Sequence, residues 1–354
     1  MRPLLFLVAF GAAVPALAQD EVAKPAQNVA VAPLPDAAPF LWRLKLHAGQ
    51  RFLTTSNTSS QTSQQMPKMP GDKTAAPEKM ESTSKTLTVV EQNVLSSDEK
   101  GARVEVVYRE MTQTMKMQQG DKVLFDSASP TAATKGITDI SKNIVGARVS
   151  YQLTPDGHIS DVQGAKEYLE RLGAGLETAT AQNPEQQKMM REMLKAAISP
   201  EALEKSIGIA YKDMPAKAVA PGDTWKYAST IAMMGTKFTQ NGQSTFVSRA
   251  GNVVTLAQKG DFATDAGAEF KIPLPMPRDP KTPAPITQLD LHGTSTGETL
   301  VDELSGMTLS SRTTQTIEGE IVINGLTGPG SVFSIPMKVT SETTTKTEEI
   351  KSAG

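Results

Sequence analysis

Two short stretches, each with a glycine turn followed by an aromatic residue, mark the points where this chain turns to β structure. Pro221–Trp225 reads Pro-Gly-Asp-Thr-Trp, and Ala48–Phe52 reads Ala-Gly-Gln-Arg-Phe. Glycine accepts positive φ, and the aromatic residue can fill a half-buried strand position. Each stretch opens a Thr/Ser-rich segment with loose alternation of apolar and polar residues. We therefore expect an α+β fold, mainly antiparallel β, with two similar β-rich halves joined by a short helical segment.

The apolar spacing places the boundaries of these parts. It is close to two over residues 39–163 and again over 209–354, which predicts the two β-rich halves. Within 164–208 the spacing lengthens towards that of a helix. Asn183-Pro184-Glu185 and Ser199-Pro200-Glu201 carry the cap, first-turn proline and acid that begin helices. The middle is therefore predicted to form short helices that cover the sheet or bridge the halves.

Three segments within the halves have distinctive patterns. Phe40–Leu46 alternates Trp42, Leu44 and Leu46 with basic residues, which predicts a strand. Residues 56–81 contain many helix and strand breakers and predict a mobile loop. The proline-rich residues 272–285 predict a loop, because proline cannot donate to a sheet ladder.

The first residues have the form of an export signal. Residues 1–18 combine Arg2, an apolar run and Ala16-Leu17-Ala18, so we expect a signal peptide cleaved after Ala18. Residues 19–38 read as a flexible lead, and no later stretch is apolar enough for a transmembrane helix. The chain has no cysteine, which excludes disulfides and a lipid-modified cysteine. We therefore predict a periplasmic or secreted protein.

Charge excludes some partners. The formal net charge is -2, which offers no electrostatic attraction to nucleic acid or to an anionic membrane surface. The expected partners are therefore an apolar small molecule, a lipid or another envelope protein.

Four short motifs occur in an order that resembles a known family. They are Gly49–Phe52, Phe125-Asp126-Ser127, Thr154–Gly157 and Pro221–Trp225. The chain is similar to a domain-of-unknown-function family of exported bacterial proteins and lipoproteins. The resemblance implies export and a β-rich body, and it brings no established catalytic residues. Unlike the lipoprotein members, this chain lacks the lipid-bearing cysteine.

No catalytic constellation is found in the sequence. Gly293–Gly297 matches the G-x-S-x-G pattern around Ser295, but the surrounding pattern is strand and turn rather than strand and helix. His47, His158 and His292 lie in separate β segments without metal-ligand spacing. We therefore predict no catalytic residue and no cofactor.

Methionine is the remaining oddity of composition, with 16 residues in clusters. Thioethers bind Cu(I), and an exported chain without cysteine could use them. Methionine is also an adaptable core filler, and each cluster shares one face of a strand or helix. The candidate copper ligands are Met111, Met115, Met117, Met189 and Met193.

Three functions remain open at this point. The first is a non-catalytic binding or scaffolding module of the cell envelope, for an apolar ligand or a protein partner. The second is an envelope-acting hydrolase whose site the sequence does not reveal. The third is methionine-based binding of Cu(I).

Overall fold

Long antiparallel strands make up most of the computed structural model, which describes residues 39–66, 78–127, 143–179, 200–233, 236–265, 269–270, 286–325 and 331–350. The helical elements are α2 (Ala165–Ala179), α4 (Pro200–Gly208) and the 3-10 turn η1 (Ile209–Tyr211). The strands are β1 (Arg51–Met66), β2 (Glu78–Asp98), β3 (Gly101–Gln119), β4 (Lys122–Asp126), β5 (Arg148–Leu153), β6 (Ile159–Gln163), β7 (Thr224–Met233), β8 (Thr236–Ala250), β9 (Val253–Thr264), β10 (Glu269–Phe270), β11 (Ile286–Asp302), β12 (Thr308–Asn324) and β13 (Val332–Glu349).

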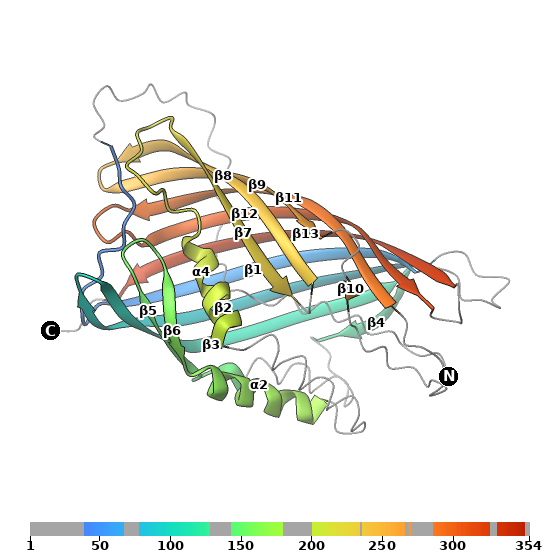
Figure 1. The fold of residues 1–354 in the computed structure, drawn as a ribbon. Helices are drawn as coiled ribbons and strands as arrows, with labels where there is room; N and C mark the ends of the chain where they lie inside the picture. The colour runs from blue at the N-terminus through green and yellow to red at the C-terminus, as the bar shows by residue number, and fades with distance from the viewer. Residues whose placement is uncertain are drawn as a thin grey trace.

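The described strands form one 13-stranded sheet (Figure 1). Its order is β6-β5-β3-β2-β1-β13-β12-β11-β9-β8-β7, with β4 beside β3 and β10 beside β11. The first and last of these strands pair in the middle of the sheet, where Phe52 of β1 stands opposite Glu349 of β13. The antiparallel, β-rich prediction is confirmed. The α+β class and the two similar halves are not confirmed, because both runs of strands belong to a single open sheet.

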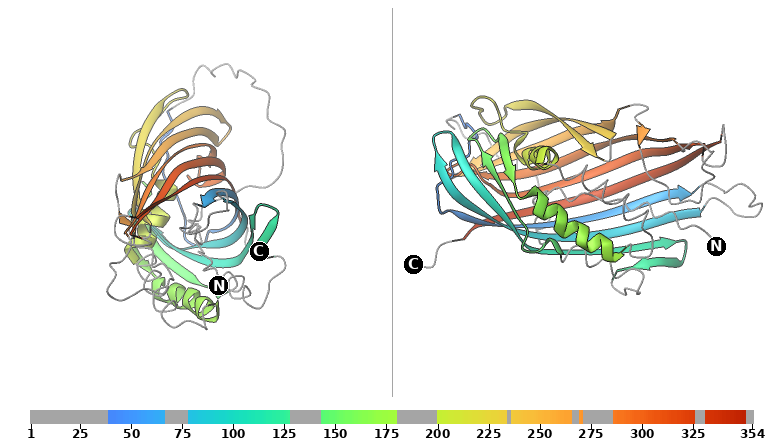
Figure 2. Two further views of the ribbon diagram at one scale, coloured as in Figure 1. Left: turned by 90° about the vertical axis from the view of Figure 1, so that its right-hand side faces the viewer. Right: turned by 60° about the horizontal axis from the view of Figure 1, so that its bottom comes forward.

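The sheet is strongly curved, and the helices lie on its concave side (Figure 2). α4 contacts both edge strands, β6 and β7, so it crosses the opening of the curve. α2 packs near β3 and β5, where Leu172 joins Ile144 and Ala147 in a small core beside Tyr108 and Met111. The two short helical elements therefore cover the concave face, as the amphipathic pattern of the middle segment predicts.

Residues 39–50, which we call the strap, cross one end of the curved sheet. The strap carries a single β-bridge, Phe40 to Val219, so the predicted strand at Phe40–Leu46 is wrong. The Trp42 indole donates to the Gly306 carbonyl at 2.8 Å, and the Leu44 amide donates to Pro155 at 2.8 Å. The strap therefore ties together hairpins that are distant in sequence.

Two hydrophobic clusters lie beneath the strap. One surrounds Leu44, and the other contains Phe40 and Trp42, each 1 % exposed. At roughly 25 cal/mol per Å² of apolar area, side chains of this size contribute several kcal/mol each when buried. The alternation that suggested a strand is therefore the burial pattern of an extended segment.

The predicted mobile loop at residues 56–81 is wrong for the part that the structure describes. β1 continues to Met66 and β2 begins at Glu78, and these strands pair through Met66 opposite Glu78. The proline and glycine residues that suggested a loop fall between these strands, in residues 67–77 outside the described part. Thr and Ser residues flanking them are compatible with strands once two neighbours supply the ladder.

Other predicted segments lie outside the described residues, namely the signal peptide at 1–18, the lead at 19–38 and the proline-rich loop at 272–285. The two glycine turns do have the expected geometry, with φ of 86° at Gly49 and 91° at Gly222. Within the described helices, none combines the length and apolar character needed to cross a bilayer.

Aromatic rings lie over glycines on the concave side of the sheet. A Cβ atom built on Gly242 would stand 2.0 Å from the Tyr227 ring, and one on Gly293 would stand 2.4 Å from the Phe262 ring. Each glycine pairs across strands with the residue that supplies the ring. The missing side chains therefore make room for rings in a tightly curved region.

We expect Gly293→Ala to destabilise the fold by about 1–3 kcal/mol, because the new methyl group would also stand 2.2 Å from the Thr316 carbonyl oxygen. The free energy of unfolding from a urea titration at constant m measures this effect. Gly173→Ala is the matched control, since no atom lies within 4 Å of its added Cβ in α2. That control should be neutral or stabilising by up to about 1 kcal/mol. Equal stability of the two variants would contradict the packing argument.

Candidate functional site

The register of the sheet defines an inner face, the side on which the strap and the helices pack. Side chains opposite one another on antiparallel strands share a face, and the faces alternate along each strand. Phe52 packs with Leu44 of the strap, so Phe52 and every second residue of β1 up to Gln64 face inward. The inward positions on β1 are Phe52, Thr54, Ser56, Thr58, Ser60, Thr62 and Gln64.

Hydroxyl groups bond to one another across the middle of the inner face. Thr54 and Thr347 share a hydrogen bond of 3.2 Å, and Thr58 and Thr343 share one of 3.1 Å. Similar bonds join Ser60 to Ser84 at 2.8 Å and Ser311 to Thr345 at 3.0 Å. Burying an unpaired hydroxyl costs about 1–3 kcal/mol, so this mutual pairing is what allows a polar lining.

Charged side chains are segregated to the outer face. No Asp, Glu, Lys or Arg stands at the inward positions of β1 from Phe52 to Gln64, at the positions opposite them on β2, or at the described inward positions of β11 and β12. On β13 the one inward acid is Glu349, at the strap end opposite Phe52. The outward positions carry them and pair across strands, as Arg312 does with Glu342 at 2.6 Å and Lys338 with Glu318. The inner face is therefore uncharged along the middle of its central strands.

The inner face becomes apolar towards the end far from the strap. Six buried residues form a cluster there, with Phe238, Ile317 and Met337 packed against it. Its members are Leu289, Leu291, Ile321, Ile323, Phe333 and Ile335. The inner face therefore has an uncharged, hydroxyl-lined middle that continues into an apolar end. Such a surface suits a ligand that is mostly uncharged.

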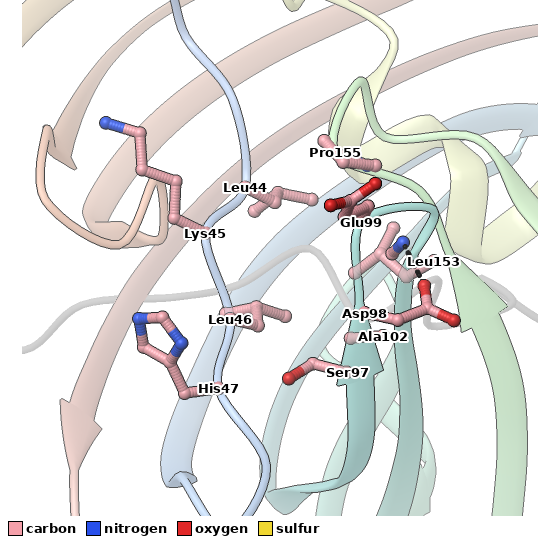
Figure 3. Close-up of a pocket in the computed structure, with 11 residues that line it drawn as sticks. Leu44, Lys45, Leu46, His47, Ser97, Asp98, Glu99, Ala102, Leu153 and Pro155 are labelled. Carbon is pink, nitrogen blue, oxygen red and sulfur yellow. Dashed lines mark hydrogen bonds between the residues drawn. The ribbon is translucent and has the colours of Figure 1, made fainter.

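A cavity of about 430 Å³ lies at the strap end (Figure 3). Leu44 and Leu46 point from the strap towards the β2–β3 turn, whereas Lys45 and His47 point the other way. Leu153 and Ala102 complete the apolar side, and the remaining lining residues are Ser97, Asp98, Glu99, Gly101 and Pro155. The Asp98 carboxylate is already used, because it accepts from the amides of Lys100 and Gly101. This cavity is small and partly apolar, and it holds no convergent pair of free acids.

A pair of charges rests on the inner face near β7, with Asp213 buried and Lys212 half-buried. Lys212 and Asp213 follow η1 and pack against β7, β8 and β9. Asp213 is 5 % exposed, and its carboxylate accepts a hydrogen bond from the Gln258 amide. The Trp225 indole donates to the Asp213 carbonyl at 2.5 Å. Lys212 donates to the Gln240 side chain, and its ammonium lies 5.3 Å from the centre of the Tyr227 ring.

Burial shifts the pKa values of this pair. It raises the pKa of Asp213 to about 6, although the Lys212 charge and the Gln258 hydrogen bond act in the opposite direction. It lowers the pKa of Lys212 to about 8, against the effect of the Asp213 charge. Burial also raises the pKa of Tyr227 to about 12, with Asp213 adding to the shift. At neutral pH both members of the pair are charged in a poorly solvated place, a pattern typical of functional sites and of buried anchors.

The candidate catalytic and metal-binding residues from the sequence motifs do not lie together in the structure. Ser295 lies in the middle of β11, 6 % exposed, and donates weakly to the Gly260 carbonyl at 3.4 Å, so it is no nucleophile elbow. His47 lies on the strap, His158 in the β5–β6 turn and His292 on the outer face of β11. The described residues contain no cluster of three His, Asp or Glu side chains suited to a metal ion.

The methionine candidates are tested only in part. Met111, Met115 and Met117 share the inward face of β3, and Met111 packs beside the cluster of Ile144, Ala147 and Leu172. Met189 and Met193 lie outside the described residues. Copper binding by these residues therefore stays a prediction.

The Lys212–Asp213 pair was not found from the sequence. These residues lie in the stretch from 209 that was read as the return of the β pattern, and their partners Gln240 and Gln258 are distant in the chain. The separation of charged residues to one face, in contrast, can be seen in the sequence. All charged residues of β11 and β12 have even numbers, so they share one face of each strand, and counting charges at alternate positions would have revealed this.

We expect Asp213→Asn to stabilise the protein at about pH 7.5 by about 1–3 kcal/mol. The raised pKa means that the carboxyl favours folding while protonated, and that this contribution is lost as the pH rises through about 6. The gain should therefore vanish near pH 3.5. Urea unfolding at both pH values measures it, with Asp261→Asn on the outer face of β9 as control. An Asn variant less stable than wild type at both pH values would show that the carboxylate holds this segment in place.

Comparison with solved structures finds only distant likeness. The lipovitellin structure that describes lipid–protein interactions aligns with TM-score 0.40 and 6% identity, over 88% of this chain and 26% of that chain. The outer membrane protein OprG from Pseudomonas aeruginosa gives TM-score 0.25 and 9% identity, over 85% of this chain and 97% of that one. The outer membrane protein AlkL gives TM-score 0.22 and 8% identity, over 91% and 98%. The chain thus spans about a quarter of the lipovitellin chain.

The search of curated proteins finds no match to this sequence. A family model does match residues 99–308, which is more than half of the chain, and its description is a family of unknown function, DUF6263. The match contains three of the four motifs that carried the resemblance, and the motif at Gly49–Phe52 precedes it. The predicted membership of a family of unknown function is therefore confirmed: this chain belongs to the DUF6263 family.

Proposed function

We propose that this protein is a non-catalytic binding module of the bacterial cell envelope, and that it holds an apolar or weakly polar ligand on its inner face. The observation that carries the proposal is the segregation of charge. Between Phe52 and Gln64 of β1, and at the inward positions of the neighbouring described strands, the side chains are hydroxyl, amide or apolar, apart from Glu349 at the strap end of β13. The other charged residues of these strands stand outward there. A ligand that sheds water on such a face leaves no charged group without a partner.

The shape of the sheet supports the same proposal. Its concave side is spanned by α4 and closed at one end by the strap, so a ligand on the inner face would contact several strands at once (Figure 2). Sites for small molecules are mostly concave and apolar, with a few polar groups that fix orientation. The apolar cluster around Ile321 and Ile335 and the hydroxyls around Thr343 supply these two kinds of surface.

The envelope location is part of the proposal and rests on the export signal read in residues 1–18. The family match does not supply a reaction, because the family is of unknown function. In the described residues, neither Ser295 nor the histidines have the partners that hydrolysis needs, so binding is the function best supported by the observed geometry.

A pair of isosteric variants tests the proposal. Gln315 faces inward on β12 and Gln61 faces outward on β1, so Gln→Glu at each position adds the same charge to opposite faces. We expect the wild-type protein to bind the neutral apolar dye Nile red, and a lipid extract of the envelope to displace it. Gln315→Glu should weaken Nile red binding about tenfold or more, because the ligand would have to desolvate a carboxylate.

Fluorescence titration measures both affinities, and Gln61→Glu should match the wild type. Absence of Nile red binding by the wild-type protein would overturn the proposed function. Equal effects of the two variants would show that the dye binds elsewhere than the inner face. Urea unfolding of both variants verifies that each is folded under the conditions of the titration.

A further inference from the structure

Lys212 places a cation, with Asp213 next to it in the chain, on an inner face whose central strands carry no charge between their ends. It follows η1, and its ammonium is held over β7 and β8 by three inward-facing side chains. It donates to the side-chain Oε1 of Gln240 and, at 3.5 Å, to the Ser229 hydroxyl, and it stands over the Tyr227 ring. These contacts fix the position of the ammonium relative to the sheet.

Lys212 makes no direct ion pair with a described residue, although the charge of Asp213 nearby favours its ammonium form. Asp213 is its neighbour in the chain, but the Asp213 carboxylate is directed to Gln258 and buried more deeply. The other side chains that contact the Lys212 ammonium, those of Gln240, Ser229 and Tyr227, are neutral. Two of the three N–H groups of the ammonium have partners among the described residues, and an anion that accepts from the third would gain a charge-assisted hydrogen bond.

Apolar side chains continue from this point along the inner face. Phe262 stands opposite Gln240 on β9, and Phe238 is the next inward residue on β8. Phe238 packs against the apolar cluster that contains Leu289 and Leu291. A path on one face of the sheet therefore begins at an ammonium, crosses two aromatic rings and reaches an apolar surface.

We propose that Lys212 binds the carboxylate of a long-chain anionic amphiphile whose hydrocarbon tail lies over Phe262 and Phe238. This inference rests on the proposed function and specifies its ligand class. The ammonium has three N–H donors, of which Gln240 and Ser229 take two, and the third donates to the carboxylate. Charge-assisted hydrogen bonds of this kind are about twice as strong as neutral ones.

Isothermal titration with dodecanoate and with dodecanol, both below their aggregation concentrations, tests the inference. The two ligands have the same tail and differ in headgroup charge. In Lys212→Met, which keeps an unbranched side chain and removes the charge, dodecanoate affinity should fall about tenfold or more while dodecanol affinity stays the same. Lys212→Arg should retain dodecanoate binding. Lys226→Met, on an exposed outward position of β7, is the matched control and should bind both ligands as the wild type does.

The outcomes separate this inference from the function on which it rests. If the wild-type protein binds neither ligand, both are overturned. If it binds both ligands and Lys212→Met retains dodecanoate affinity, the ammonium site is wrong and the binding function stands. If Lys212→Met loses both ligands while Lys212→Arg keeps both, Lys212 supports the structure of the face rather than the carboxylate, which also overturns the inference.

Discussion

The tight curvature of one large sheet is the constraint on which the other features depend. Side chains on the inside of a curve converge, so they must be small, or must lie flat over positions that carry no side chain. Thr and Ser line the middle of the inner face, and Tyr227 and Phe262 cover Gly242 and Gly293. Small hydroxyl groups cannot supply a large apolar core, and they remain stable there because they pair with each other.

Because the inside of the curve has little room, the larger apolar side chains gather at the two ends of the inner face. The strap brings Phe40, Trp42 and Leu44 to one end, and the cluster around Ile321 occupies the other. The bond from Trp42 to Gly306 fixes where the strap crosses, and a Cβ on Gly306 would collide with the Arg43 carbonyl oxygen at 2.0 Å. The uncharged stretch between the ends is the part of the molecule left available for a ligand, and Lys212 lies at its margin.

Local patterns predicted a mainly antiparallel β structure, and pairing between distant segments decided how the strands are arranged. Alternation and turn chemistry predicted antiparallel strands, the turns at Gly49 and Gly222 and the helical character of the middle. Phe40–Leu46 was predicted to be a strand, because an unpaired extended segment that buries every second side chain has the same alternation as a paired strand. The flanks of the predicted loop became strands because β1 gains ladders on both sides, from β2 and β13. Lys212 and Asp213 were missed, since their partners come from β7, β8 and β9.

The seam between β1 and β13 has a consequence for the order of folding. Phe52 pairs with Glu349, so the central ladder joins residues almost at opposite ends of the chain. Contacts of such long sequence separation form slowly, because the loop entropy is lost before the ladder is gained. Until the last strand has been synthesised, β1 has a bare edge, and such an edge invites pairing with another chain. A newly synthesised chain therefore leaves this edge of β1 uncovered until β13 is available to pair with it.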